Sequence, residues 1–154
     1  MARYAVAGRT PGVTNTLDLV AYQLWNPHAS ISLFVREIHH FKSAATADNL
    51  KIVRTTTSGT PGSTVTPLIN NHFGKRYAHI SVALLYLAVF SVQPTLAGPE
   101  MFRIALPAAI GAGIIWVFPE PIEIPAGTGL GVAVPEAGTE LAITAADVSF
   151  VWDE

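Results

Sequence analysis

Eleven prolines and twelve glycines divide the 154-residue sequence into short segments, and this punctuation limits the folds that the chain can adopt. The segments between them are rich in β-branched and aromatic residues, which favour strands. No stretch carries three turns of helical periodicity, and clusters of proline and glycine are typical of turns between short strands. The sequence therefore predicts an all-β protein.

We expect a strand wherever such a segment is bounded by turn residues, and a loop at residues 58–63. Eight or more strands at this spacing predict a single jelly-roll-like β-sandwich with an extended N-terminal arm. The arm covers residues 1–15, with a candidate first strand at residues 4–7, and the sandwich domain covers residues 16–154. The other expected strands are residues 16–25, 31–41, 49–57, 80–92, 102–106, 113–118, 122–124, 130–134 and 141–152, the last with an irregularity near residue 146.

Two of these segments indicate how the strands are covered. Residues 16–25 become apolar on both faces toward their end, so we expect one face against the core and the other against a neighbouring subunit or a loop. Residues 49–57 alternate apolar side chains with Lys51 and Arg54, which predicts a half-exposed strand.

The composition is unusually apolar for a soluble domain. Hydrophobic residues make up 50% of the chain and charged residues 13%, with a mean hydropathy of +0.40, whereas an ordinary soluble domain has about 25% charged residues. The runs at residues 82–92 and 104–118 are too short for a membrane-spanning helix, which needs about 20 residues. We expect no membrane partner, although a lipid-facing barrel stays open as an alternative. We expect the excess apolar residues to lie in subunit interfaces.

The first residues lack the apolar region of a signal peptide, and the chain has no cysteine. Both features fit synthesis and assembly in a reducing cytoplasm.

Charge is distributed unevenly along the chain. Residues 1–77 hold eight Lys or Arg against three Asp or Glu, and residues 78–154 hold one against eight. Either strands from both halves interleave and mix these charges in space, or the subunit has complementary patches that steer docking. The basic residues are scattered, so we expect no nucleic-acid partner.

The histidines do not form a metal-binding pattern. His39 and His40 are adjacent, and successive side chains on a strand point to opposite faces. His28, His72 and His79 are isolated. We expect no metal site, because the ligands of one site must converge.

No sequence motif predicts an enzyme or a cofactor. The glycine-rich segments 58–64 and 127–131 lack the context of a P-loop or a dinucleotide fingerprint, and no Gly-x-Ser-x-Gly elbow is present. A glycosidase pair stays open from spacing alone, and the paired carboxylates are Glu120 with Glu123, Glu136 with Glu140, and Asp153 with Glu154.

Aromatic residues near strand ends can fill a core, form an interface or bind carbohydrate. The three tryptophans lie in such positions, and a core role is the simplest interpretation of them. The candidate interface residues are Tyr4, Arg9, Tyr22, Trp25, Tyr86, Phe90, Trp116 and Trp152.

Several strings resemble one family over nearly the whole chain. They are AGRTP at residues 7–11, AYQLWNP at 21–27, VREIH at 35–39, RTTTSGTPGSTVTP at 54–67, LPAAIG at 106–111, IWVFP at 115–119, IPAGTGL at 124–130 and DVSFVWDE at 147–154. The sequence is similar to small virion structural proteins of tailed bacteriophages, the head decoration (cement) proteins.

The resemblance implies a jelly-roll-like protein that binds the outer capsid surface as a homotrimer, with the major capsid protein as its partner. It implies assembly in the host cytoplasm and stabilisation of the head by binding the assembled shell. No catalytic residue carries over. Two alternatives stay open: a tail-fibre, head-fibre or baseplate module that contacts the host surface, and a carbohydrate-binding or hydrolytic jelly roll.

Overall fold

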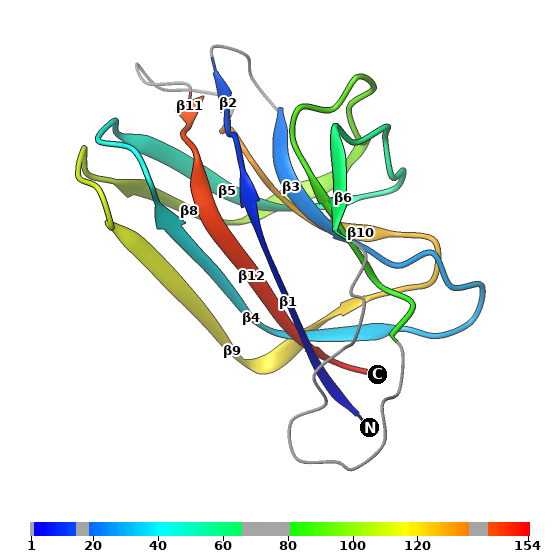
Figure 1. Ribbon diagram of the computed structural model, residues 1–154. Helices are drawn as coiled ribbons and strands as arrows, with labels where there is room; N and C mark the ends of the chain where they lie inside the picture. The colour runs from blue at the N-terminus through cyan, green and yellow to red at the C-terminus, as the bar shows by residue number, and fades with distance from the viewer. Residues whose placement is uncertain (1, 15–18, 66–80, 136–141) are drawn as a thin grey trace.

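The computed structural model describes residues 2–14, 19–65, 81–135 and 142–154. Within these ranges there is no helix, and two antiparallel sheets pack against each other as a sandwich (Figure 1). The prediction of an all-β sandwich-like fold is confirmed.

The smaller sheet has four strands in the order β1-β12-β4-β9. Its strands come from both ends and the middle of the chain, so residues far apart in sequence become neighbours. Their bounds are β1 Arg3–Thr10, β4 Leu33–Lys42, β9 Gly113–Ile124 and β12 Ala146–Asp153.

The larger sheet has six strands in the order β6-β7-β3-β10-β5-β8. Their bounds are β3 Val20–Trp25, β5 Asp48–Thr55, β6 Ser63–Val65, β7 Leu84–Leu87, β8 Leu96–Leu106 and β10 Gly129–Ala133. A two-stranded ribbon of β2 Val13–Thr14 and β11 Ala142–Ile143 adjoins them. Gly12 turns the chain from β1 into β2 at φ +86°, and a Cβ there would lie 2.2 Å from the carbonyl oxygen of Ile143.

The antiparallel pairs are nested. β1 pairs with β12, β3 with β10, β4 with β9, and β5 with β8, so each pair encloses the next along the chain. The chain is thus one long double strand that folds over to make both layers.

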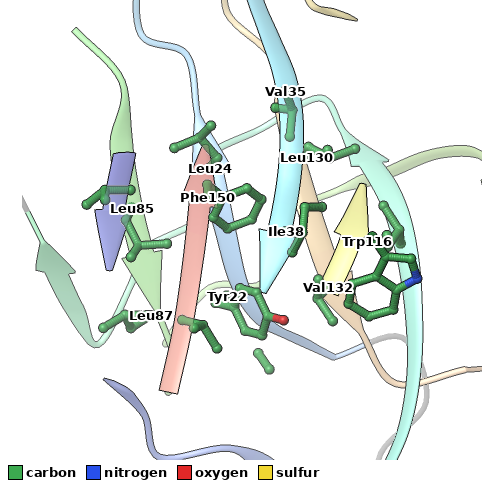
Figure 2. Packing of buried hydrophobic residues seen from close by; sticks show 14 of the residues in the cluster. Tyr22, Leu24, Val35, Ile38, Leu85, Leu87, Trp116, Leu130, Val132 and Phe150 are labelled. Atoms are coloured by element: carbon green, nitrogen blue, oxygen red, sulfur yellow. The ribbon is translucent and has the colours of Figure 1, made fainter. Parts of the chain in front are cut away.

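The core lies between the sheets, where side chains from β3, β7 and β10 meet those from β4, β9 and β12. Burying each large apolar side chain contributes about 1.5–3 kcal/mol, so this layer is the main source of stability. The labelled residues in Figure 2 are Tyr22, Leu24, Val35, Ile38, Leu85, Leu87, Trp116, Leu130, Val132 and Phe150.

The segment after β7 covers the outer face of the larger sheet. Phe90 packs with Val20, Val53 and Ala133 in a second apolar cluster. The side chain of Gln93 accepts a hydrogen bond from the backbone N–H of Val20 at 3.0 Å and holds this segment down. A loop of the same chain therefore covers the second face of residues 20–25, one of the two covers expected there.

Four of the expected strands have other bounds in the structure. Of the described part of the segment 80–92, residues 81–92, only Leu84–Leu87 form a strand, because the residues after them fold over the sheet. The strands expected at 113–118 and 122–124 are one strand, Gly113–Ile124, and the strand expected at 102–106 starts at Leu96. The prediction that residues 49–57 form a half-exposed strand is also wrong. Lys51 is 4% and Val53 is 2% exposed, because the outer face of β5 is covered.

The expected N-terminal arm lies within the sandwich over residues 3–10. These residues form β1, which pairs with β12 along its whole length. Ala2 and Glu154 continue the pairing with two reciprocal backbone hydrogen bonds. Pro11 and Gly12 follow this strand and do not interrupt it.

The uneven charge along the chain is mixed in the folded molecule. Arg3 and Arg36 from the basic half both bind Asp153 of the acidic half, and Arg9 binds Asp147. Strands of the two halves alternate in the smaller sheet, so the first of the two interpretations holds for these residues.

Candidate functional site

Large exposed apolar side chains gather on β9, on the turn before it and on the end of β4. Ile110 is 72% exposed, Val117 63%, Ile115 49% and Phe41 40%. Ile115 and Val117 lie opposite His39 and Glu37 in the β4–β9 register, on the outer face of the smaller sheet. We call Phe41, Ile110, Ile115 and Val117 the apolar corner. Exposed apolar patches of this kind mark contact sites.

The turn between β8 and β9, at the left of Figure 1, contains Ile110. The end of β4 fixes this turn in place. Lys42 donates from its backbone N–H to Ala112 O, and Gly111 N–H donates to Lys42 O, each at 2.9 Å. The Lys42 ammonium group is buried and donates to Pro107 O at 2.6 Å and to Thr46 O. The turn with Ile110 is therefore held rigidly, which lowers the entropy cost of docking.

Phe41 lies against the first residue of β9. A Cβ on Gly113 would be 2.4 Å from both the Phe41 ring and His40 O, so the ring covers the space that a side chain would need. The missing side chain lets β4 and Phe41 approach β9 closely.

Ion pairs lie on the same outer face beyond the apolar corner. Arg9 Nε is 2.7 Å from Asp147 Oδ1, and Arg3 and Arg36 hold the two oxygens of Asp153 at 2.9 and 2.8 Å. The hydrogen bond and charge of Arg9 lower the pKa of Asp147. The hydrogen bond of Arg3 lowers the pKa of Asp153 and, with Arg36, outweighs the opposite effect of burial.

Between the ion pairs and the apolar corner lies a shallow open hollow of about 380 Å³. His39 Nε2 is 2.8 Å from Glu37 Oε2, and Ser149 lies directly opposite His39 in the register of β12 and β4. The lining residues are Ala7, Gly8, His39, Phe41, Asp147, Val148 and Ser149.

A chain of polar side chains connects the two sheets inside the core. Tyr22 Oη is 3.1 Å from His40 Nδ1, and His40 Nε2 is 3.2 Å from Asp48 Oδ2. Asp48 Oδ1 accepts the backbone N–H of Thr144 at 2.9 Å. With Asp48 ionised, Nε2 donates to it, and Nδ1 of a neutral imidazole accepts from Tyr22. The side chains of His40 and Asp48 are fully buried, so this chain of hydrogen bonds links β3, β4 and β5 in the interior.

Burial shifts two pKa values in this chain. Burial raises the pKa of Tyr22, and the charge of Asp48 raises it further. Burial alone would raise the pKa of Asp48, but the hydrogen bonds from His40 and Thr144 outweigh it and lower that pKa.

Most residues expected at an interface are buried within the chain, so their side chains contribute little to its surface. Tyr4 stacks on Trp152 with ring centres 5.8 Å apart, and both are in the core. Trp25 and Tyr86 are half-buried, and Arg9 is exposed in its ion pair. Aromatic rings at strand ends fill a core as readily as an interface, so residue type alone does not separate the two. The buried ones are Tyr4, Tyr22, Phe90, Trp116 and Trp152.

Sequence reasoning missed the four residues of the apolar corner. A signal was present, because Ile115 and Val117 alternate with Trp116 and Phe118 and make both faces of that strand apolar. One of those faces had to lie outside the sandwich core.

Among the described residues, no three His, Asp or Glu side chains lie close enough to hold a metal ion together. Glu123 accepts a hydrogen bond from the Ser32 hydroxyl at 2.7 Å. His72, His79, Glu136 and Glu140 lie outside the described residues.

In the parts of the chain that the structure describes, no helix is long and apolar enough to span a membrane. A comparison of the chain with models of protein families, with curated proteins and with solved structures finds no match in any of the three.

Proposed function

We propose that the chain is a structural protein of a tailed-bacteriophage virion, a jelly-roll decoration protein that binds the outside of the head as a homotrimer. The nested pairs support the jelly-roll assignment. The orders β1-β12-β4-β9 and β3-β10-β5-β8 are those obtained when one long double strand of eight strands rolls into two sheets. In this assignment β6 and β7 extend the second sheet at its β3 side.

The observation that carries the proposal is the rigid apolar corner. Ile110 and Val117 are more than half exposed, and the buried Lys42 fixes the turn that presents Ile110. A monomer gains nothing from holding an apolar side chain rigidly in water. Obligate subunit interfaces are more apolar than ordinary surface and bury about 2,000 Å² or more. Sister subunits and the capsid shell are the proposed cover.

The role follows from mass action. A protein that binds the assembled shell and not its separated subunits shifts the equilibrium toward the shell. Decoration in this sense needs surface complementarity and no catalytic group.

Two measurements test the proposal. The first is the mass in solution, for which we expect about 49 kDa, three times the 16.4 kDa of the chain. The second is co-sedimentation with capsid shells that lack the protein, for which we expect saturable binding. A 16.4 kDa particle that stays in the supernatant would contradict both the trimer and the decoration role.

The fibre or baseplate alternative differs in copy number. Decoration requires hundreds of copies on each particle, whereas a fibre module needs few, so quantitative gel densitometry of purified virions separates them. A glycan array and a hydrolase screen on the purified protein address the sugar-binding and hydrolytic alternatives, and we expect no signal in either.

A further inference from the structure

The two main sheets have four edges among the described strands, and three of these edges are poorly suited to accept another strand. β9 has prolines at residues 119 and 121, and β8 has Pro99 beside Gly98, whose φ is +73°. β6 has only three residues. Proline removes a donor, and short or irregular edges resist pairing. The edge of β1 is the exception, because Arg3–Thr10 contains no proline and pairs with β12 without a bulge.

The hydrogen bonds at the start of β1 show which of its backbone N–H and C=O groups point away from β12. Ala2 and Glu154 exchange both backbone hydrogen bonds, at 2.8 and 2.9 Å. Hydrogen-bonded and non-hydrogen-bonded pairs alternate in an antiparallel ladder. The even-numbered residues of β1 therefore bond to β12, and the N–H and C=O groups of Arg3, Ala5, Ala7 and Arg9 point away from it. Among the described residues, no strand pairs with that side of β1.

The side chains beside this edge leave room for another strand. Ala5 and Ala7 are small and lie on the outer face at its centre, and the open hollow begins at Ala7. An added strand could therefore place one long side chain across Ala7 into the hollow, as pockets beside an edge do in strand-addition complexes.

The arginines at the two ends of the edge favour an acidic partner. Arg3, Arg9 and Arg36 bind the carboxylates of Asp147 and Asp153, and the charge of Glu37 also acts on Arg3. Arg3 and Arg9 bind through Nε and Nη2, and their side chains are 50% and 66% exposed. A guanidinium group has five N–H donors, so the Nη1 side of each can bind a second carboxylate. The preference for an acidic partner therefore comes from unused donors of the exposed guanidinium groups and not from a surplus of positive charge.

From these features we infer that the free edge of β1 is a docking site for an extended acidic segment of a partner protein, which adds as an antiparallel strand. The segment carries carboxylates six residues apart, opposite Arg3 and Arg9. This inference rests on the proposed function for one detail: in the decorated head the segment belongs to the capsid protein.

A defined peptide tests the inference without any capsid. The probe is the heptapeptide Asp-Thr-Val-Thr-Val-Thr-Asp, whose ends face Arg9 and Arg3 when it pairs with residues 3–9. Binding to the whole protein is followed by amide NMR, and we expect shifts and protection at Arg3, Ala5, Ala7 and Arg9. The matched peptide with Lys at both ends should bind about tenfold more weakly, because two ion pairs are replaced by repulsion.

Two variants at one position separate edge pairing from other contacts. Ala5→Pro removes an N–H that points away from β12 and leaves the hydrogen bonds between β1 and β12 in place. We therefore expect a folded protein that binds the peptide at least about tenfold more weakly. Ala5→Thr keeps the N–H and should bind like the wild type. Protection of the Val6 amide reports that the β1–β12 pairing is intact in both variants.

Three results of the peptide experiments would overturn the inference: no peptide binding, equal binding by Ala5→Pro and Ala5→Thr, or shifts confined to the β8–β9 turn. Protection of the β1 edge that grows with protein concentration in the absence of peptide would assign the edge to a second copy of the chain, which also overturns it. Capsid co-sedimentation by the wild type is measured separately, so failure of the edge and failure of the decoration role are distinguishable.

Discussion

The two most apolar runs of the chain, residues 82–92 and 104–118, differ in which of their residues the same chain covers, although each run has both buried and exposed apolar side chains. In the first run Leu85, Leu87 and Phe90 are at most 5% exposed. In the second run Ile110 and Val117 are 72% and 63% exposed. β7 lies inside its sheet and is followed by a segment that folds over that sheet, whereas β9 is an edge strand whose outer face has no cover among the described residues. Hydropathy thus indicates that a segment needs cover, and the strand order decides whether the same chain supplies it.

The largest expected effect on the free energy of unfolding comes from shortening a buried side chain of the first run, compared with an exposed side chain of the second. Leu85→Ala removes a fully buried side chain between the sheets and should lower the free energy of unfolding by about 3–4 kcal/mol. The control, Ile115→Ala in the second run, should change it by less than about 0.5 kcal/mol. Urea unfolding of the two variants checks the difference, and similar losses would show that the runs are equivalent.

Phe90→Ala tests the cover of the larger sheet. The ring packs on Val20, Val53 and Ala133, so its loss should cost about 3 kcal/mol, at the low end for phenylalanine because the site can open to water. Val89→Ala changes the neighbouring side chain, which is 65% exposed, and should leave thermal stability unchanged. Equal melting temperatures for the two variants would contradict the described packing.

Lowering the pH should reduce stability through the buried Asp48 and not through the second run, because residues 104–119 carry no charged side chain. The pKa of Asp48 is lowered in the folded state, so its contribution to stability is present above the unfolded pKa of about 4 and is lost as the pH falls through the folded value. Asp48→Asn should cost about 2 kcal/mol at neutral pH and should flatten the loss of stability below pH ~4. Asp147→Asn, at an exposed ion pair, is the control, and unfolding curves at several pH values provide the measurement.

Lys42→Met tests how the turn of the second run is held. The carbonyl groups of Thr46 and Pro107 lose their charged donor, but a buried charge is also removed, so we expect a loss of only about 1 kcal/mol. The amide of Gly111 should exchange with solvent faster, while the Val6 amide stays protected. Unchanged exchange at Gly111 would mean that the backbone bonds alone hold the turn, and Arg103→Met on β8 serves as control.

Ile110→Asp should have the smallest effect on stability, within about 0.5 kcal/mol, because the side chain is exposed. In the proposed trimer it should abolish association or capsid binding, as judged by light scattering and co-sedimentation. Val92→Asp, a matched change at an exposed residue of the first run, should leave both unchanged. A trimeric Ile110→Asp variant that binds capsids would remove the apolar corner from the proposal.

Several strands could be predicted closely from the sequence. Expected strands at 31–41, 49–57 and 130–134 correspond to Leu33–Lys42, Asp48–Thr55 and Gly129–Ala133. Each is a segment rich in apolar or β-branched residues between turn residues, and this local signal needs no knowledge of neighbours.

The remaining features depend on contacts between distant segments. Pro119 and Pro121 divide the expected strand, yet at a sheet edge a proline can lack its N–H without losing a ladder bond. Gln93 fixes the cover of the larger sheet by reaching Val20, and no periodicity marks such a contact. For the candidate site, the alternation at 115–118 shows that two faces are apolar, but only the strand order shows that the face with Ile115 and Val117 is the outer one.

The nested pairing has a consequence for synthesis on the ribosome. Of the described strands β1 leaves the ribosome before the others and its partner β12 after them, so β1 must wait, with both of its edges open, until the strands between the two have been made. The inner pairs close shorter loops and can form earlier, because closing a long loop costs more entropy. Neighbouring nascent chains on one messenger RNA therefore expose the same unpaired strand at the same time, and the opportunity for one chain to meet another begins before either has finished folding.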